Sequence, residues 1–421
     1  ECFPSPKDVN PQIAKDMKTE ENIEINIDKE KPFSALVFKT IADPFIGRLS
    51  MFKVITGKAE SDMNVYNPNK DKHEKFGAIY FMKGKQQIST KEIIAGDIGA
   101  VNKLQYTVTG DTLCDPDLNI MYEEINFPEA CISMAILPKS KNDEDKISSG
   151  LARLLEEDPA FKVSRDIENA ETIISGIGET HLEVIASKLK NKFGVDVELQ
   201  EPKIPYRETI RKTSDAQGKH KKQSGGHGQY GDVVIKFEPR YDGDELEFID
   251  KIVGGVVPRQ YIPAVEKGLL ECIKEGVLAG YPVIRLKATL HDGSYHTVDS
   301  SEMAFKIAAS LAYKKGMIEA EPILLEPIVK ASIMVTDEYM GDVIGDINKK
   351  RGRVTGMEQS GKYQRIIAEV PQSEMIKYAT DLRSLTQGRG SFTMEFDRYE
   401  EVPEFEAQKI IEKRKEEKEM V

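Results

Sequence analysis

Two separate parts of the chain share one order of strand and helix patterns, and this order restricts the fold more than any other feature. Residues 130–199 alternate as strand, helix, strand, strand, helix and strand, and residues 327–396 repeat that order without obvious sequence identity. The helix predicted over Glu179–Phe193 has apolar residues at helical spacing, and Gly194 follows where a C-terminal cap belongs. The order βαββαβ predicts a ferredoxin-like sandwich in each part.

The remaining segments predict a multidomain chain. Residues 32–125 contain short β-rich segments separated by turns, which predicts an all-β barrel. The fold class is therefore an all-β barrel followed by α+β domains, in which two ferredoxin-like βαββαβ sandwiches flank an α+β domain. The expected boundaries are 1–31 for a linker without periodicity, 32–125, 126–202, 203–325, 326–402, and 403–421 for a charged helical tail.

The composition restricts the cellular compartment and the classes of partner that we expect for the protein. The 421 residues are too many for one hydrophobic core, no apolar run approaches the ~20 residues of a membrane span, and a signal-peptide pattern is missing. The four cysteines are scattered, which favours a reducing compartment such as the cytoplasm and disfavours structural zinc. The formal net charge of −12 argues against a general nucleic-acid binder.

One segment departs from this acidic average. Residues 203–223 contain seven Lys and Arg against Glu208 and Asp215, which leaves a local net charge of +5. A basic arm on an acidic body suits a protein that contacts RNA at chosen places. The alternative is that the segment is only a solvated strand face. The candidate residues of the basic arm are Arg211, Lys212, Lys219, Lys221 and Lys222.

A small polar loop at Gln223–Gly231 contains Gly226-x-Gly228-x-x-Gly231, which fits the dinucleotide-binding fingerprint. That fingerprint has meaning only where a strand precedes it and a helix follows, because the helix N-terminus holds the pyrophosphate. Here the preceding residues are polar, and the following segment Asp232–Glu238 consists of β-formers. The glycines are therefore expected at the bend of a long hairpin, where a positive φ is needed.

A second polar loop covers His291–Glu302 and follows a strand predicted over Val283–Leu290. Asp299 is expected to cap the next helix, with Glu302 as its reciprocal partner. Loops held on stiff strands and helices are where binding residues usually lie. Both polar loops are therefore candidate binding sites.

The side chains of the two loops allow several kinds of chemistry. Four of them could form a metal cluster, namely His291, Asp292, His296 and Asp299. Their spacing and the missing third soft ligand disfavour a metal. His296 is either a loop histidine bonded to its own backbone or a donor to phosphates and base edges. Tyr230 and Tyr295, one in each loop, could stack on unpaired bases.

The chain contains no visible catalytic motif. Thr56-Gly57-Lys58 resembles the end of a Walker A motif but lacks the upstream glycine, and Asn69-Lys70-Asp71 resembles a guanine-specificity motif at the wrong spacing. No serine or cysteine nucleophile stands in a recognisable context. We therefore expect this chain to be no enzyme by itself and to hold no cofactor.

Long motifs in a fixed order match one family. They are Gly47–Gly57, Ser175–Val184, Gln223–Gly231, Gly293–Glu302, Leu325–Ile328, Gly341–Gly352 and Leu382–Gly388. In these segments the chain resembles bacterial elongation factor G, the ribosomal translocase among the translational GTPases, without its GTP-binding domain. The resemblance implies that residues 1–31 continue from that missing domain and that the full-length protein is a ribosome-dependent GTPase.

The resemblance also implies the partners of the protein. These are both ribosomal subunits with their RNA, and tRNA and mRNA in the decoding region. GTP and Mg are implied only for the missing domain, no membrane is involved, and the protein is expected to be a monomer off the ribosome. The implied role is to promote translocation of tRNA and mRNA during protein synthesis in the cytoplasm.

The family places both polar loops at the tip of its fourth domain, which enters the decoding site beside tRNA, and His296 matches the tip histidine. The implied tip residues are Ser224, Gly225, Gly226, His227, Gly228, Gln229, Tyr230, Ser294, Tyr295 and His296. The implied contacts with large-subunit RNA are Gly341, Asp342, Asn348, Lys349, Lys350 and Arg351.

Two tip residues depart from the commonest family pattern. His227 stands where arginine is usual, and Thr297 stands where aspartate is usual. Arginine to histidine removes a permanent charge and a planar fork that grips phosphate. These departures favour a divergent, second-copy paralogue, and they leave open a protein specialised in ribosome recycling or ribosome protection. A nucleotide-dependent enzyme and a general RNA-binding module are more distant alternatives.

Overall fold

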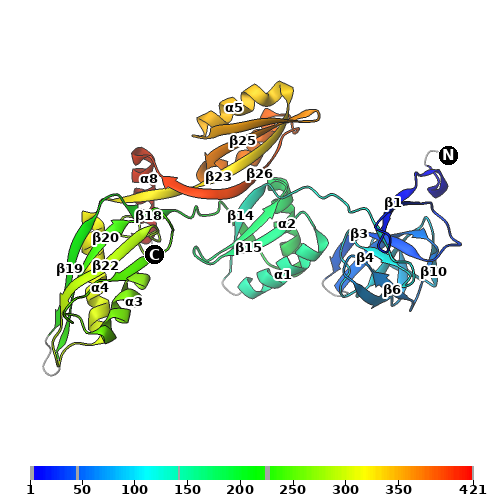
Figure 1. Ribbon diagram of the computed structural model, residues 1–421. Coiled ribbons are helices and arrows are strands. Elements are labelled where there is room, and N and C mark those ends of the chain that lie inside the picture. The colour runs from blue at the N-terminus through cyan, green and yellow to red at the C-terminus, as the bar shows by residue number, and fades with distance from the viewer. Residues whose placement is uncertain (1–3, 44–46, 141–142, 223–227, 420–421) are drawn as a thin grey trace. The chain divides into compact units, whose positions relative to one another are not determined.

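The computed structural model describes residues 4–43, 47–140, 143–222 and 228–419 (Figure 1). The chain separates into two compact units. The first comprises Glu1–Pro202 with Ile376–Asp381, and the second comprises Lys203–Met375 with Leu382–Val421. Among the described residues, no helix has the length and apolar character needed to span a membrane.

The first unit begins with an eight-stranded sheet whose neighbouring strands are antiparallel. In spatial order its strands are β7 (Lys72–Lys75), β6 (Asn64–Asn67), β12 (Thr112–Cys114), β3 (Ser34–Asp43), β4 (Gly47–Thr56), β11 (Ile98–Asn102), β8 (Ile79–Lys83) and β9 (Gln86–Thr90). Strands β5 (Lys58–Glu60) and β10 (Glu92–Ile94) form a separate pair. The core contains Phe52, which stacks on Phe76 at 5.4 Å between ring centroids.

The segment predicted as a linker contains strands. β1 (Gln12–Asp16) pairs with β2 (Asn22–Ile25) on one side and with β13 (Ile120–Tyr122) on the other. Ala14 and Ile25 are buried in a small cluster with apolar residues of the large sheet. The segment expected as a linker without periodicity over 1–31 therefore contains two strands, because its few apolar residues meet a partner strand more than a hundred residues away.

The second part of the first unit is a four-stranded antiparallel sheet with two helices. Its elements are β14 (Ile132–Pro138), α1 (Glu144–Glu157), β15 (Lys162–Asp166), β16 (Glu171–Gly176), α2 (Glu179–Phe193) and β17 (Val197–Gln200). The element order is the predicted βαββαβ. Gly194 ends α2 in the left-handed conformation with φ of 69°, as its position in the sequence predicts.

The second unit begins with β18 (Arg207–Ile210) and a four-stranded sheet in the order β19-β20-β22-β21. This sheet contains β19 (Ser214–Lys222), β20 (Gln229–Pro239), β21 (Glu247–Asp250) and β22 (Leu286–Ser294). Helices α3 (Ile262–Cys272) and α4 (Glu302–Glu319) pack together in one hydrophobic core with this sheet (Figure 1). β19 and β20 form the long hairpin that the sequence predicts.

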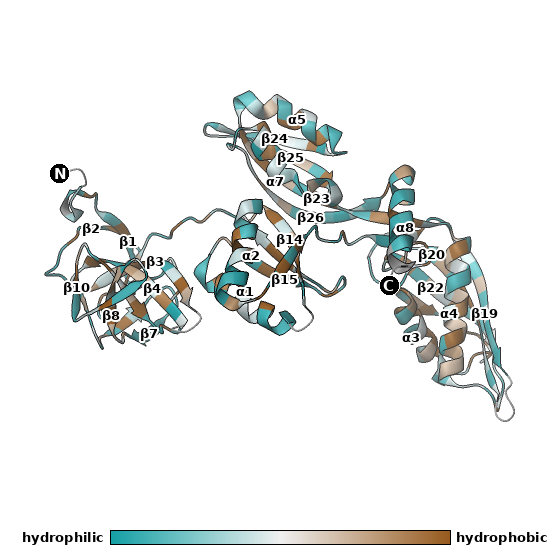
Figure 2. Cartoon of the chain, turned by 180° about the vertical axis from the view of Figure 1, so that it is seen from behind, coloured by the Kyte–Doolittle hydropathy of each residue, from teal (hydrophilic) through white to brown (hydrophobic). Residues whose placement is uncertain are grey.

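The chain ends in a second βαββαβ arrangement. Its elements are β23 (Pro322–Thr336), α5 (Met340–Lys349), β24 (Arg353–Ser360), β25 (Tyr363–Pro371), α6 (Gln372–Met375), α7 (Tyr378–Leu385) and β26 (Ser391–Glu401). β23 pairs with both β25 and β26, and its first residues also pair with β18. The final helix α8 (Glu404–Glu419) is hydrophilic over most of its length (Figure 2).

Candidate functional site

The two polar loops lie side by side at one end of the sheet of β19, β20 and β22. The last pair of the β19–β20 hairpin joins Lys222 to Gln229, and β22 pairs with β20 as far as Ser294 opposite Asp232. A further bridge joins Tyr230 to Ser300. We call residues 228–230 and 294–301 the tip. The predicted tip residues Ser224, Gly225, Gly226 and His227 lie outside the described residues.

β22 is longer than the sequence predicts. The strand was expected to end at Leu290, but it continues to Ser294 with a bulge at His291. Pairing with β20 holds these polar residues in the strand. Of the four residues considered as a metal cluster, His291 has its Nε2 2.9 Å from Asp215 Oδ1, while His296 and Asp299 lie together. Among the described residues, no three His, Cys, Asp or Glu side chains are arranged to hold a metal.

Asp299 joins the two halves of the tip. Its Oδ1 accepts the Gly228 N–H at 3.0 Å, and its backbone carbonyl accepts the Tyr230 N–H at 2.8 Å. Ser300 adds a third bond, since its hydroxyl donates to the Tyr230 carbonyl at 3.0 Å. Backbone groups near a hairpin bend have few partners within the hairpin itself, so these bonds from the second loop satisfy them. Residues 228–230 and the second loop are therefore joined to each other.

His296 is held by its own loop and keeps about half of its side chain exposed. Its Nδ1 accepts the N–H groups of Val298 at 3.3 Å and Asp299 at 3.2 Å. A neutral ring in this arrangement carries its proton on Nε2, because Nδ1 is the acceptor. A protonated ring can instead donate from Nδ1 to Asp299 Oδ2, which is 3.2 Å away. In both states Nε2 is a donor.

A polar network supports the tip from below. The Tyr230 hydroxyl lies 2.7 Å from Ser294 Oγ, and Ser294 donates to the buried Asp232 carboxylate at 2.7 Å. Lys219 Nζ lies 3.7 Å from Asp232 and 5.5 Å from the centre of the Tyr230 ring. A hydrogen bond with Tyr230 and the charge of Asp232 raise the pKa of Lys219, so the lysine stays cationic. Tyr230 is thus fixed by neighbours on several sides.

The two tip tyrosines differ in what they can contact. Tyr295 is exposed, with 46% of its surface accessible, as is the nearby Val298 at 62%. Tyr230 is half-buried, and its ring lies 6.3 Å from the ring of His296. Of the two, Tyr295 is the better placed to stack on an unpaired base.

The helix cap and the glycines differ from the sequence prediction. Ser301, rather than Asp299, caps α4, because Ser301 Oγ accepts the Ala304 N–H at 3.2 Å. Gly228 and Gly231 do not have positive φ. Gly231 is needed for close approach instead, since a Cβ there would lie 2.5 Å from the carbonyl oxygen of Ala304. The glycine serves packing of β20 on the first turn of α4.

The predicted basic arm has two parts. Arg211 and Lys212 precede β19, and each forms an ion pair with a glutamate of the second unit. Lys219, Lys221 and Lys222 lie in β19, toward the tip, and the last two are exposed. Exposed lysines near the tip can contact phosphate without breaking an existing pair.

The residues predicted for large-subunit RNA also separate into two kinds. Gly341, Asp342, Asn348 and Lys349 are exposed on α5, and Lys350 follows the helix. Arg351 was predicted as an RNA contact, but its guanidinium binds the Glu326 carboxylate at 2.6 and 2.9 Å and Glu374 at 3.0 Å. Its hydrogen bonds to the Glu326 carboxylate raise the pKa of Arg351. Arg351 therefore serves the structure of its own domain, because both carboxylates would lose their partner if it left.

The residues that assemble the tip could not be predicted from the sequence. Asp232, Asp299 and Ser300 bind the loops together, although none was singled out for that role. The only available signal was the run of short polar residues from 299 to 301, which local rules assign to helix capping. Their actual partners are far away in the sequence, and Asp299 bonds to a residue 71 positions before it.

Comparison with known proteins matches nearly the whole chain to one family. The models of Elongation factor G domain 2, Elongation Factor G domain III, Elongation factor G domain IV and Elongation factor G C-terminus match residues 32–116, 127–201, 202–321 and 323–410. A crystal structure of a protein from Thermus thermophilus is similar at a TM-score of 0.74 and 40% identity, over 92% of this chain.

The chain spans 58% of the length of that Thermus protein. None of the four matching models describes a GTP-binding domain. The four models follow one another in the chain without overlap and leave only short segments between them. The chain belongs to the elongation factor G family, of which it carries domains II, III, IV and the C-terminal domain.

Proposed function

We propose that this chain is the part of a translation elongation factor that binds the ribosome and promotes translocation of tRNA and mRNA. The observation that carries the proposal is the tip, in which Asp299 and Ser300 join two polar loops at the end of a stiff hairpin. A preassembled tip loses little conformational entropy on binding, so it can occupy a site and exclude tRNA from moving back. The family match supports the ribosome as the partner.

Each described side chain of the tip has a role in this proposal. His296 donates from Nε2 to a phosphate or a base edge, whether neutral or protonated. Tyr295 stacks on an unpaired base in the decoding region. Lys221 and Lys222 neutralise phosphates, which makes the contact dependent on salt. GTP and Mg have no role in this chain and are assigned to a domain outside it.

A second contact is assigned to the C-terminal domain. The exposed residues of α5, Gly341, Asp342, Asn348 and Lys349, together with Lys350, face large-subunit RNA in this proposal. In this proposal Arg351 supports that surface, because its guanidinium is held by Glu326 and Glu374. Its role is to fix the end of α5.

We assign both βαββαβ parts to the ferredoxin-like architecture. In each sheet the first and third strands are central, and the second and fourth strands are at the edges, in the orders β15-β16-β14-β17 and β24-β25-β23-β26. This order and the antiparallel pairing are what that architecture requires.

A second candidate function is ribosome recycling or ribosome protection by a divergent paralogue. His227 and Thr297 favour it, because both depart from the family pattern within the tip. Single-turnover translocation and subunit-splitting assays on the full-length protein distinguish the two functions. Fast splitting with little translocation would establish the second.

Chemical footprinting of ribosomal RNA with the purified chain tests ribosome binding by the tip. The expected result is protection of bases in the decoding region, weakened by Lys221→Glu with Lys222→Glu and by raised salt. The matched control is Lys212→Glu, which changes a lysine outside the tip. Saturable ribosome binding without any protection in the decoding region would contradict the proposed place of the tip.

A further inference from the structure

The edge of β3 has backbone groups that no strand pairs. β4 pairs with one side of β3 up to Asp43, and Ala42 lies opposite Arg48. On the other side, β12 pairs only with Ser34–Leu36, and within the described residues no other strand continues along this edge. An unpaired strand edge is a ready template for further hydrogen bonding. Ala42 is nevertheless buried, so something covers it.

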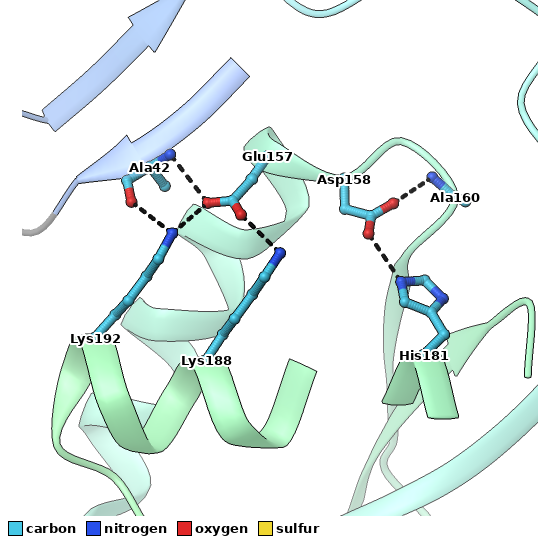
Figure 3. Close-up of polar contacts among 7 residues, drawn as sticks. All are labelled: Ala42, Glu157, Asp158, Ala160, His181, Lys188 and Lys192. Carbon is cyan, nitrogen blue, oxygen red and sulfur yellow. Dashed lines mark hydrogen bonds and ion pairs between the residues drawn. The ribbon is translucent and has the colours of Figure 1, made fainter. Parts of the chain in front are cut away.

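Side chains of the following βαββαβ part take the place of a neighbouring strand at Ala42 (Figure 3). The Ala42 N–H donates to Glu157 Oε2 at 3.1 Å, and the Ala42 carbonyl accepts from Lys192 Nζ at 3.2 Å. Lys192 also donates to Glu157 Oε2 at 2.7 Å. In a sheet, a partner strand would accept the Ala42 N–H with a carbonyl and donate an N–H to the Ala42 carbonyl. Here a carboxylate and an ammonium group take these two roles.

Ion pairs hold the side chains of Glu157 and Lys192 in place. Glu157 Oε1 accepts from Lys188 Nζ at 2.7 Å, and Lys188 and Lys192 lie four residues apart on one face of α2. The Glu157 side chain is only 11% exposed. Burial alone would raise the pKa of Glu157, but hydrogen bonds from both lysines and from Ala42 outweigh it and lower the pKa. The carboxylate is therefore charged while it holds the strand edge.

The position of Glu157 in its helix is unfavourable by itself. It is the last residue of α1, where the last turn has no basic residue and Asp158 follows. Acidic groups at the C-terminal end of a helix oppose the helix dipole. Each of these acids has a partner elsewhere: Asp158 binds His181 Nε2 at 2.8 Å and the Ala160 N–H at 3.0 Å (Figure 3). The acids at this end therefore serve contacts beyond α1.

We infer that Glu157, Lys188 and Lys192 form a docking surface for the exposed edge of β3, which fixes the eight-stranded sheet against the first βαββαβ part. The partner of this surface is the backbone of Ala42, so the contact recognises a free strand edge rather than a particular side chain. The Asp158–His181 pair joins the C-terminal end of α1, where Glu157 lies, to the first turn of α2. This role does not depend on the ribosome.

Distances between two spin labels, measured by electron paramagnetic resonance in the full chain, test whether the sheet docks on the βαββαβ part. Spin labels are placed at Ile88→Cys in the sheet and Val184→Cys in α2, both exposed positions, with the native cysteines replaced by alanine. The expected distance distribution is narrow, and it broadens in Glu157→Ala and in Lys192→Met. The matched control is Lys190→Met, because Lys190 lies on the same helix but pairs with Asp196. Its distribution should remain narrow.

Hydrogen exchange provides a second readout in the unlabelled chain. Loss of Glu157 removes the acceptor of the Ala42 amide and should raise its exchange rate about fivefold or more, in line with the loss of one charge-assisted bond. Loss of Lys192 removes the donor to the Ala42 carbonyl and a partner of Glu157, so it should raise the same rate indirectly. Protection of β4 and α2 amides reports whether a variant still folds. If the Glu157→Ala variant does not fold, the Lys192→Met variant tests the docking contact in its place. Unchanged distances and unchanged Ala42 exchange in a folded variant would overturn the inference.

Discussion

At the residue scale, Asp299 connects residues 228–230 to the second polar loop. Asp299 uses its carboxylate, its carbonyl and its N–H for three bonds, with Gly228, Tyr230 and His296 respectively. The family motif points to His296 directly, because one histidine stands at a matching position. Asp299 could not be predicted in the same way, since the nearest local rule makes it a helix cap and its partner Gly228 is distant in the sequence.

Removal of the Asp299 side chain should loosen the tip without unfolding the domain. Asp299→Ala leaves the Gly228 N–H without its acceptor and is expected to cost about 1–2 kcal/mol locally. Hydrogen exchange of the Gly228 amide should therefore accelerate roughly tenfold, while the amides of the β19–β20 ladder stay protected. Asp299→Asn keeps an acceptor oxygen and serves as the control. Equal exchange rates in wild type and Asp299→Ala would refute the joining role.

At the element scale, the hairpin packs on α4 through positions that have no room for a side chain. A Cβ at Gly218 would lie 2.0 Å from the carbonyl oxygen of Ala308 and 2.4 Å from the nitrogen of Ala312. Sequence patterns predicted the hairpin and gave the bounds of α2 as the structure has them. They failed for β1 and β2, whose strands form only with a distant partner, and for the end of β22, which its pairing with β20 extends.

Gly218→Ala should destabilise the second unit, because overpacking against a helix backbone costs about 1–3 kcal/mol or more. Gly345→Ala is the matched control, since a Cβ there meets nothing within 4 Å and helix propensity gains roughly 0.5–1 kcal/mol. Urea denaturation, with hydrogen exchange to assign the transition, measures both changes. If the Gly218→Ala chain is as stable as the wild type in urea, β19 does not pack closely on α4 at Gly218.

The stabilisation by Glu157 should depend on pH in a definite direction. Its pKa is lowered in the folded chain, so its contribution is fully present above its pKa in the unfolded chain, about 4.3. The contribution is lost as the pH falls through the lowered folded value. The difference in stability between wild type and Glu157→Gln should therefore be constant from pH 8 to 6 and shrink below pH 4. A difference that grows on acidification would contradict this assignment.

At the scale of the whole molecule, the order of four family domains could be predicted from the sequence, because long motifs identify each of them in turn. The sequence could not show which basic residues form ion pairs with carboxylates in the folded chain. Arg211, Lys212 and Arg351 have carboxylate partners, whereas Lys221 and Lys222 are exposed near the tip. Ion pairs form between residues that only the fold brings together. The number of Lys and Arg in the sequence is therefore larger than the number available to bind phosphate.

The central proposal is that the tip promotes movement of tRNA and mRNA, with GTP hydrolysis assigned to a domain outside this chain. The most direct test measures translocation and ribosome-dependent GTP hydrolysis side by side with the full-length protein and its His296→Ala variant. The account predicts that translocation slows about tenfold or more, which corresponds to roughly 1.4 kcal/mol of lost stabilisation, with GTP hydrolysis nearly unchanged. Equal loss of both activities, or no loss of translocation, would contradict it.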